Sequence, residues 1–159
     1  MIAKGALLFF GLVGTAVAPA TGELALTAQQ QRDFLKVCKE WREAGATLPA
    51  GLYAVWRPEG ERFWTSAGFA STMAVYNRAA RRVELFRDSV LDWRDWPFKT
   101  ILRHEVGHAA GLGHAKCVWS EALHEDVPLG EVMCPYQGRA ERGISDWDRA
   151  ALRLVGEVW

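Results

Sequence analysis

The stretch HEVGHAAGLGH, at residues 104–114, decides how the rest of the chain is interpreted, because it holds three of the four histidines in 159 residues. His104 and His108 are four residues apart, so on a helix they lie on one face, one turn apart, where both imidazoles can reach one ion. Gly111 tolerates a positive φ and lets the chain leave the helix. His114 can then return from outside the helix as a third nitrogen ligand. The spacing therefore predicts a metal site.

Three neutral nitrogens with one open position are typical of a catalytic zinc site, whereas structural zinc sites have four protein ligands. Glu105 follows the first histidine and can stand beside the metal without binding it, which is where a general base must stand. Zinc lowers the pKa of water towards about 7 and polarises a carbonyl. Glu105 would take the proton of that water and pass it to a leaving amine. Tyr136 is the candidate phenol for holding the oxyanion, and His124 is interpreted as a loop residue.

The overall charge gives no reason to expect nucleic acid as a partner. Lysine and arginine together number 19, and so do aspartate and glutamate, so the formal net charge is zero. A nucleic-acid-binding protein normally presents a basic field. Half of the residues are hydrophobic, and the length suits one domain. We expect a monomer that acts on peptides or proteins.

The first twenty residues have the composition of a secretory signal. Lys4 precedes an uncharged apolar stretch at residues 5–18, and Ala18-Pro19-Ala20 supplies small residues at a cleavage site. The apolar stretch is short for a membrane span, so no stable span is expected after processing. We therefore predict a signal peptide at residues 1–20 and a single catalytic domain at residues 21–159, in a secreted, periplasmic or extracellular location.

The remaining chain has the pattern of an α+β fold with one sheet. Apolar residues at three- and four-residue spacing predict a helix over 27–44, with Thr27 as its cap and Gly45 as its stop. β-branched and aromatic residues predict strands over 52–57, 62–67, 73–77 and 82–87. The motif lies on a helix over 99–111, which Asp92 or Asp95 would cap. About twenty residues with little periodicity follow His114, and a last helix over 145–158 is capped by Ser145, with Leu152, Val155 and Trp159 pointing inward.

From the motif onwards the sequence resembles the metzincin clan of metallopeptidases, and within it the matrixin-like members. The extended motif at residues 104–114 carries the resemblance, together with Val132-Met133-Cys134-Pro135-Tyr136, which resembles the Met-turn. The run Ile144-Ser145-Asp146-Trp147-Asp148, followed by Ala150, Ala151 and Leu152, resembles the start of the C-terminal helix. The resemblance implies a metzincin-like twisted mixed sheet, mostly parallel, with one antiparallel edge strand. It also implies that Met133 lies beneath the zinc.

The same resemblance implies how a substrate is held. An extended peptide would add to the edge strand, for which residues 73–77 are the candidate, because backbone hydrogen bonds hold any extended segment and a side pocket sets selectivity. The pocket wall would come from residues 114–133 and from those after Tyr136. Trp119 is the candidate aromatic residue of this pocket, whereas most of the eight tryptophans are expected in the core.

The sequence departs from the family pattern at several places. Ala115 stands where a polar residue usually follows the third histidine, and Cys134 stands where the Met-turn usually has tyrosine. Between the signal and the first helix we expect no room for the inhibitory propeptide. The loops that bind structural calcium and a second zinc are missing, so we expect one zinc and no required calcium.

The family fold would bring two of the three cysteines together. A bond between Cys117 and Cys134 would close a loop of about 17 residues and contribute about 3 kcal/mol in the chain-entropy model. The alternatives are a bond from Cys38 to one of them, or three free thiols, which would suit a cytosolic protein better.

Two other functions compete with a zinc endopeptidase. One is a zinc-containing binding or inhibitory module without turnover, against which the presence of Glu105 argues. The other is a hydrolase that cuts the stem peptides of peptidoglycan with similar zinc chemistry.

Overall fold

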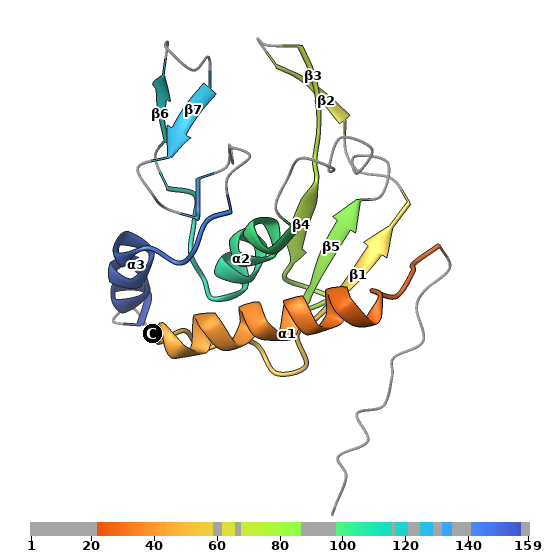
Figure 1. The fold of residues 1–159 in the computed structure, drawn as a ribbon, viewed down its shortest axis with the longest axis horizontal. Coiled ribbons are helices and arrows are strands. Elements are labelled where there is room, and N and C mark those ends of the chain that lie inside the picture. The colour runs from red at the N-terminus through yellow and green to blue at the C-terminus, as the bar shows by residue number, and fades with distance from the viewer. Residues whose placement is uncertain are drawn as a thin grey trace, which may run out of the picture.

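The computed structural model describes residues 22–58, 62–65, 68–86, 98–115, 117–120, 125–128, 132–134 and 141–156. The predicted signal at residues 1–20, Asp92, Asp95, His124, Tyr136 and Trp159 lie outside these ranges. Within them, Figure 1 shows a mixed α+β fold. Its elements are α1 Ala28–Glu43, β1 Tyr53–Arg57, β2 Arg62–Thr65, β3 Gly68–Ser71, β4 Ala74–Asn77, β5 Arg82–Phe86, α2 Phe98–Ala109, β6 Cys117–Ser120, β7 Glu125–Pro128 and α3 Asp146–Gly156.

The largest sheet in the described part of the chain has the order β1-β5-β4. Strand β5 lies in the middle, parallel to β1 and antiparallel to β4. Val83 and Leu85 of β5 are fully buried, as expected for a central strand. The mixed sheet and the antiparallel edge strand β4 are confirmed. The expectation of a mostly parallel sheet is not met in the described residues, because one strand pair is parallel and the other antiparallel.

Two hairpins correct the expectation of a single sheet. Strands β2 and β3 form one two-stranded sheet, and β6 and β7 form another. The second hairpin lies in the segment after His114, which was expected to be irregular. Strand β7 has the sequence Glu125-Asp126-Val127-Pro128, and acidic residues and proline are depleted in strands, so this segment carries little strand signal. The pairing of Val118 with Val127 becomes visible only when the two strands meet.

Helix α1 begins and ends where the sequence predicts. Thr27 and Gln30 form a capping box, and Gly45 after the helix has a φ of 101°. Phe34, Val37, Cys38 and Trp41 are its buried face. Figure 1 shows α1 running beneath both α2 and the sheet, so its apolar face covers the core from one side. None of the described helices is long and apolar enough to cross a membrane.

The N-terminus of α3 is closed by a second reciprocal cap. The backbone N–H of Asp148 donates to Ser145 Oγ at 3.1 Å, and the backbone N–H of Ser145 donates to Asp148 Oδ2 at 2.7 Å. The predicted cap at Ser145 is therefore confirmed. Leu152 is buried and Val155 packs against the core, as expected for an amphipathic last helix.

Candidate metal centre

The three histidines of the motif converge at the end of α2. His108 Nε2 lies 3.1 Å from both His104 Nε2 and His114 Nε2, and one ligand atom from each residue lies within 4.8 Å of the others. Nitrogen ligands at 2.0–2.1 Å from a tetrahedral ion are about 3.3–3.4 Å apart. The three nitrogens are therefore spaced as ligands of one ion would be.

Two backbone carbonyls orient the buried rings. His104 Nδ1 lies 2.9 Å from the carbonyl oxygen of Val132, and His108 Nδ1 lies 2.8 Å from that of Leu112. A carbonyl accepts only from a protonated nitrogen, so in each ring Nδ1 carries the proton and Nε2 keeps its lone pair. Metal-binding histidines usually donate their other N–H in this way, which fixes the ring and the tautomer. Both Nε2 atoms are thus prepared for a cation.

Burial keeps the inner histidines neutral. It lowers the pKa of His104 to about 4, and the charges of His108 and His114 act in the same direction against a hydrogen bond to Val132 that raises it. Burial also lowers the pKa of His108. Neutral imidazole is the form that binds a metal. His104 is buried, His108 is half-buried and His114 is exposed, so the site opens to solvent at His114.

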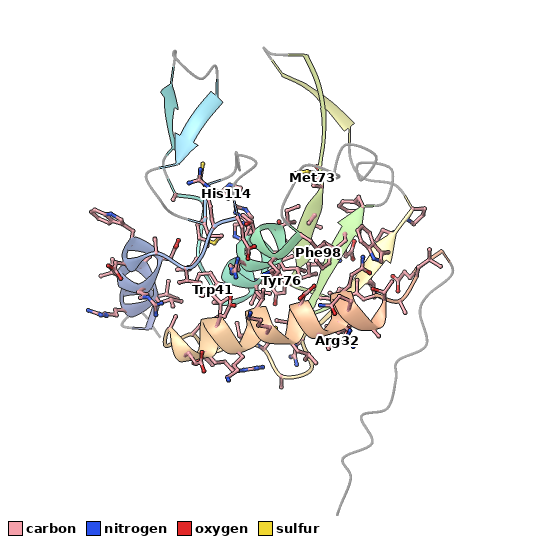
Figure 2. The ribbon with its side chains drawn as sticks, in the orientation of Figure 1. Arg32, Trp41, Met73, Tyr76, Phe98 and His114 are labelled. Atoms are coloured by element: carbon pink, nitrogen blue, oxygen red, sulfur yellow. The ribbon has the colours of Figure 1, made fainter. Side chains whose placement is uncertain are left out.

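Figure 2 shows the direction of that opening. The labelled His114 lies on the side of α2 away from α1, whereas the labelled Trp41 lies between α2 and α1. In Figure 1 both hairpins, β2–β3 and β6–β7, extend on the same side of α2 as this opening. The core therefore packs against one side of the centre, and the opposite side, with the exposed His114, is open to solvent.

Glu105 is the acidic residue that follows the first histidine of the centre on α2. Only 6% of it is exposed, and burial raises its pKa to about 8, against a backbone hydrogen bond from Tyr76 that lowers it. A carboxyl in such an environment is a stronger base than one in water. Because Tyr76 lies on β4, this hydrogen bond also joins the motif helix to the edge strand.

The pairing of β4 shows which of its backbone groups remain on the free edge. The N–H of Phe86 donates to the carbonyl of Met73, and the direction of such groups alternates along an antiparallel strand. Met73 and Val75 therefore turn towards β5, while Ala74 and Tyr76 turn towards the other edge. The bond from the Tyr76 N–H to Glu105 agrees with this alternation.

No protein-family model, curated protein or solved structure matches this chain.

A turn at residues 132–134 supports the centre from beneath. The carbonyl of Val132 accepts from His104, and the carbonyl of Met133 accepts from the N–H of Ala115, the neighbour of His114. The Met133 side chain packs against Gly107 so closely that a Cβ added at Gly107 would overlap its Sδ. The turn therefore contacts the motif at its first ligand, in its middle and at its end.

Two segments hold α2 in place. Trp41 Nε1 donates to the carbonyl of Arg103 at 2.9 Å, and Arg103 Nε donates to Glu40 at 2.7 Å, which ties α2 to α1. On its other side Arg103 Nη1 donates to the carbonyl of Arg142 at 2.7 Å and lies 3.2 Å from Glu141. The residue before the first ligand is thus anchored in two directions, so the helix has little freedom to shift.

His104, His108 and His114 lie together, and Gly111, with a φ of 95°, ends the motif helix as expected. Tyr136 lies outside the described residues, so its role stays a prediction.

The cysteines divide into one free and one bonded residue within the described side chains. Cys38 is free and buried, and Cys134 is disulfide-bonded. A bond from Cys38 and a set of three free thiols are therefore both wrong. The partner predicted for Cys134, Cys117, begins β6, and its side chain lies outside the description.

Sequence reasoning missed three residues that support the centre without binding a metal. Arg103 and Gly107 are sequence neighbours of the ligands His104 and His108, whereas Trp41 lies 62 residues before Arg103. One signal was available for Gly107, since a glycine inside a helix costs about 1 kcal/mol relative to alanine and usually marks close packing.

Proposed function

We propose that this chain is a zinc-dependent endopeptidase of metzincin-like, matrixin-like type. The observation that supports it best is the convergence of three histidine nitrogens. The buried Glu105 lies on the same helix as two of these histidines, His104 and His108. Three imidazoles leave a coordination position open, which distinguishes a catalytic zinc site from a structural one. Glu105 is not among the three candidate metal ligands, so its carboxyl can accept and donate a proton.

The donor set suits zinc. Imidazole nitrogens favour zinc, copper, iron or nickel, whereas calcium and magnesium take oxygen ligands. Burial keeps His104 and His108 neutral, and the carbonyls of Val132 and Leu112 orient their rings, as is usual for zinc ligands. When bound, a zinc ion supplies Lewis acidity, which polarises a substrate carbonyl and makes water more acidic. We propose one zinc and no required calcium.

Glu105 performs the proton transfers. Its carboxyl accepts the proton of the attacking water, so the oxygen gains its nucleophilic lone pair, and then delivers that proton to the nitrogen of the leaving amine. The C–N bond breaks as the amine takes the proton. In the metal-free chain burial raises the pKa of this carboxyl, which makes it a stronger base than a carboxyl in water. Tyr136 is proposed to donate to the oxyanion.

The edge strand is the proposed substrate platform. The N–H and C=O of Ala74 turn away from β5, and so does the C=O of Tyr76. An extended peptide can bind such groups through its own backbone, whatever its side chains. Because Tyr76 donates its N–H to Glu105, a peptide on this edge passes next to the proposed base. This placement favours protein segments as substrates.

The disulfide at Cys134 supports a location outside the cytosol. Stable disulfides form in oxidising compartments such as the periplasm or the extracellular space. Export and removal of residues 1–20 remain proposals that rest on the sequence. N-terminal sequencing of the exported chain tests them, with a first residue of Thr21 as the expected result.

The test of the proposed activity compares three forms of the purified chain. Zinc content is measured by elemental analysis, and cleavage is measured on casein and on a broad peptide library, with and without a chelator. The unmutated chain should bind one zinc and cleave only without the chelator. Glu105→Ala should keep the zinc and lose about 10²–10⁴ in kcat/KM.

The matched control is Glu43→Ala, which removes an exposed glutamate at the end of α1. It should leave both zinc content and kcat/KM unchanged. A zinc-loaded chain that cleaves no peptide in the library would refute the endopeptidase and favour a binding or inhibitory module. Cleavage of peptidoglycan stem peptides alone would favour the third function. Full activity in Glu105→Ala would show that Glu105 is not the base.

A further inference from the structure

We propose that Asp148, the residue of α3 that bonds back to the Ser145 cap, is a positioning residue for the metal centre, because it holds the backbone of Val132, whose carbonyl orients His104. This inference rests on the metal-binding part of the proposed function. It assigns to α3 a role that the motif itself does not include, since Asp148 lies 34 residues beyond the last of the three histidines in the sequence.

Asp148 is buried, and its carboxylate accepts hydrogen bonds from two segments of the chain. Only 2% of the residue is exposed, which is unusual for an aspartate. Its Oδ2 accepts from the N–H of Ser145 at 2.7 Å, from Ser145 Oγ at 2.8 Å and from the N–H of Val132 at 3.2 Å. Two of these bonds complete the helix cap. The third leaves the helix and reaches the turn at residues 132–134.

Val132 is also bonded through its carbonyl, to the ring of His104. Its carbonyl accepts from His104 Nδ1 at 2.9 Å, and Val132 itself is fully buried. The N–H and the C=O of this one residue are therefore bonded in opposite directions, to Asp148 and to His104. With both groups held, the residue has no freedom to rotate its carbonyl away from the ring. The link acts through position, because the two groups belong to different peptide units.

The link from Asp148 through Val132 joins α3 to a ligand on α2. The turn that carries Val132 follows β7 in the sequence, and the ring that it orients lies on α2. Within the described residues the turn also contacts the opposite end of the motif, where the carbonyl of Met133 accepts from the N–H of Ala115. Asp148 thus ties the turn to a rigid helix close to His104. Partners that orient metal ligands typically change metal affinity by about 10–100-fold when they are removed.

The test measures zinc affinity by competition with a chromogenic chelator in four folded forms of the chain. Asp148→Ala should weaken zinc binding by about 10–100-fold relative to the unmutated chain. Asp148→Asn should retain most of the zinc affinity, because the amide oxygen of asparagine can replace Oδ2. The amide nitrogen would then occupy the place of Oδ1, which has no hydrogen-bond partner in the described structure. Ser145→Ala is the matched control, because it removes hydroxyl bonds of the same cap and keeps the link to Val132.

Two results would overturn the inference: an Asp148→Ala chain that binds zinc as tightly as the unmutated one, or an equal loss in Asp148→Ala and Ser145→Ala. The second would show that the helix end matters and the link does not.

A second measurement covers the case in which Asp148→Ala does not fold. In the metal-free unmutated chain, ¹⁵N spectra should show His104 as the tautomer protonated at Nδ1, and the Val132 amide should be protected from hydrogen exchange. The opposite tautomer, or an unprotected Val132 amide, would overturn the inference without any zinc being added. An unmutated chain that binds no zinc would refute the proposed function, and these spectra would still decide on the link.

Discussion

Gly107 lies at the centre of the motif helix, where the structure leaves no room for a side chain. A Cβ at this position would overlap Met133 Sδ and would lie 2.9 Å from Trp41 Cζ2 and 3.2 Å from Met133 Cε. Ordinary contacts of a Cβ begin at about 3.4 Å. Neither neighbour has free space to move into, because Met133 is 3% exposed and Trp41 is fully buried. Gly107→Ala should therefore strain the packing beneath the centre.

The expected cost follows from two opposing effects. Alanine is favoured over glycine inside a helix by about 1 kcal/mol. Overpacking of a tight core typically costs about 1–3 kcal/mol, and two displaced side chains place this site near the upper end. The net destabilisation should be about 2 kcal/mol, which corresponds to a fall in Tm of roughly 4–8 °C for a chain of this size. Thermal and urea unfolding of the chelated protein measure it, so that metal binding does not contribute.

Gly113→Ala is the matched control for this substitution. Gly113 lies in the same motif and a Cβ there would meet nothing within 4 Å. Its change in unfolding free energy should stay within about 0.5 kcal/mol. A double-mutant cycle with Met133→Ala tests the stated cause. Removing the methionine should reduce the cost of Gly107→Ala by about 1–2 kcal/mol. Additive effects of the two substitutions, or an unchanged Tm in Gly107→Ala, would refute the packing explanation.

Three further predictions concern buried polar groups. In the metal-free chain the pKa of Glu105 is raised from 4.5 to about 8, so the folded state binds the extra proton between these values and its stability falls as the pH rises through them. Glu105→Gln should remove this fall and stabilise the chelated chain by up to about 3 kcal/mol at pH 7, measured by urea unfolding from pH 5 to 8; an unchanged pH profile would contradict it. Burial raises the pKa of Cys38 from 9.0 to about 11, so at pH 8 its alkylation by iodoacetamide should be at least about 100-fold slower in the native chain than in urea, and equal rates by mass spectrometry would show that the thiol is exposed. Arg103→Lys should destabilise the chain by about 1–2 kcal/mol, because one ammonium group cannot replace a guanidinium that bonds Glu40 and a backbone carbonyl together. The exposed pair made by Lys39 is the control, and Lys39→Ala should change stability by less than about 0.5 kcal/mol.

The elements that were predicted well are those with local signals. Helix α1 shows a regular apolar period between a capping threonine and a glycine, and both signals act over one turn of the chain. The strands β1, β4 and β5 were also found within one or two residues of their observed ends. The hairpin of β6 and β7 was missed because β7 consists of two acidic residues, a valine and a proline, which are mostly residue types that strands disfavour.

The sequence by itself determined which atoms could bind a metal. The spacing of His104 and His108 places them one helical turn apart, and Gly111 allows His114 to return, so the ligand set depends only on local geometry. The tertiary structure alone decided how those ligands are held. The carbonyl that orients His104 comes from Val132, 28 residues away, and the carboxylate that holds the N–H of Val132 comes from Asp148 of α3. Contacts of this kind arise from burial and from the need of every buried polar group for a partner, and neither leaves a period or a motif in the sequence.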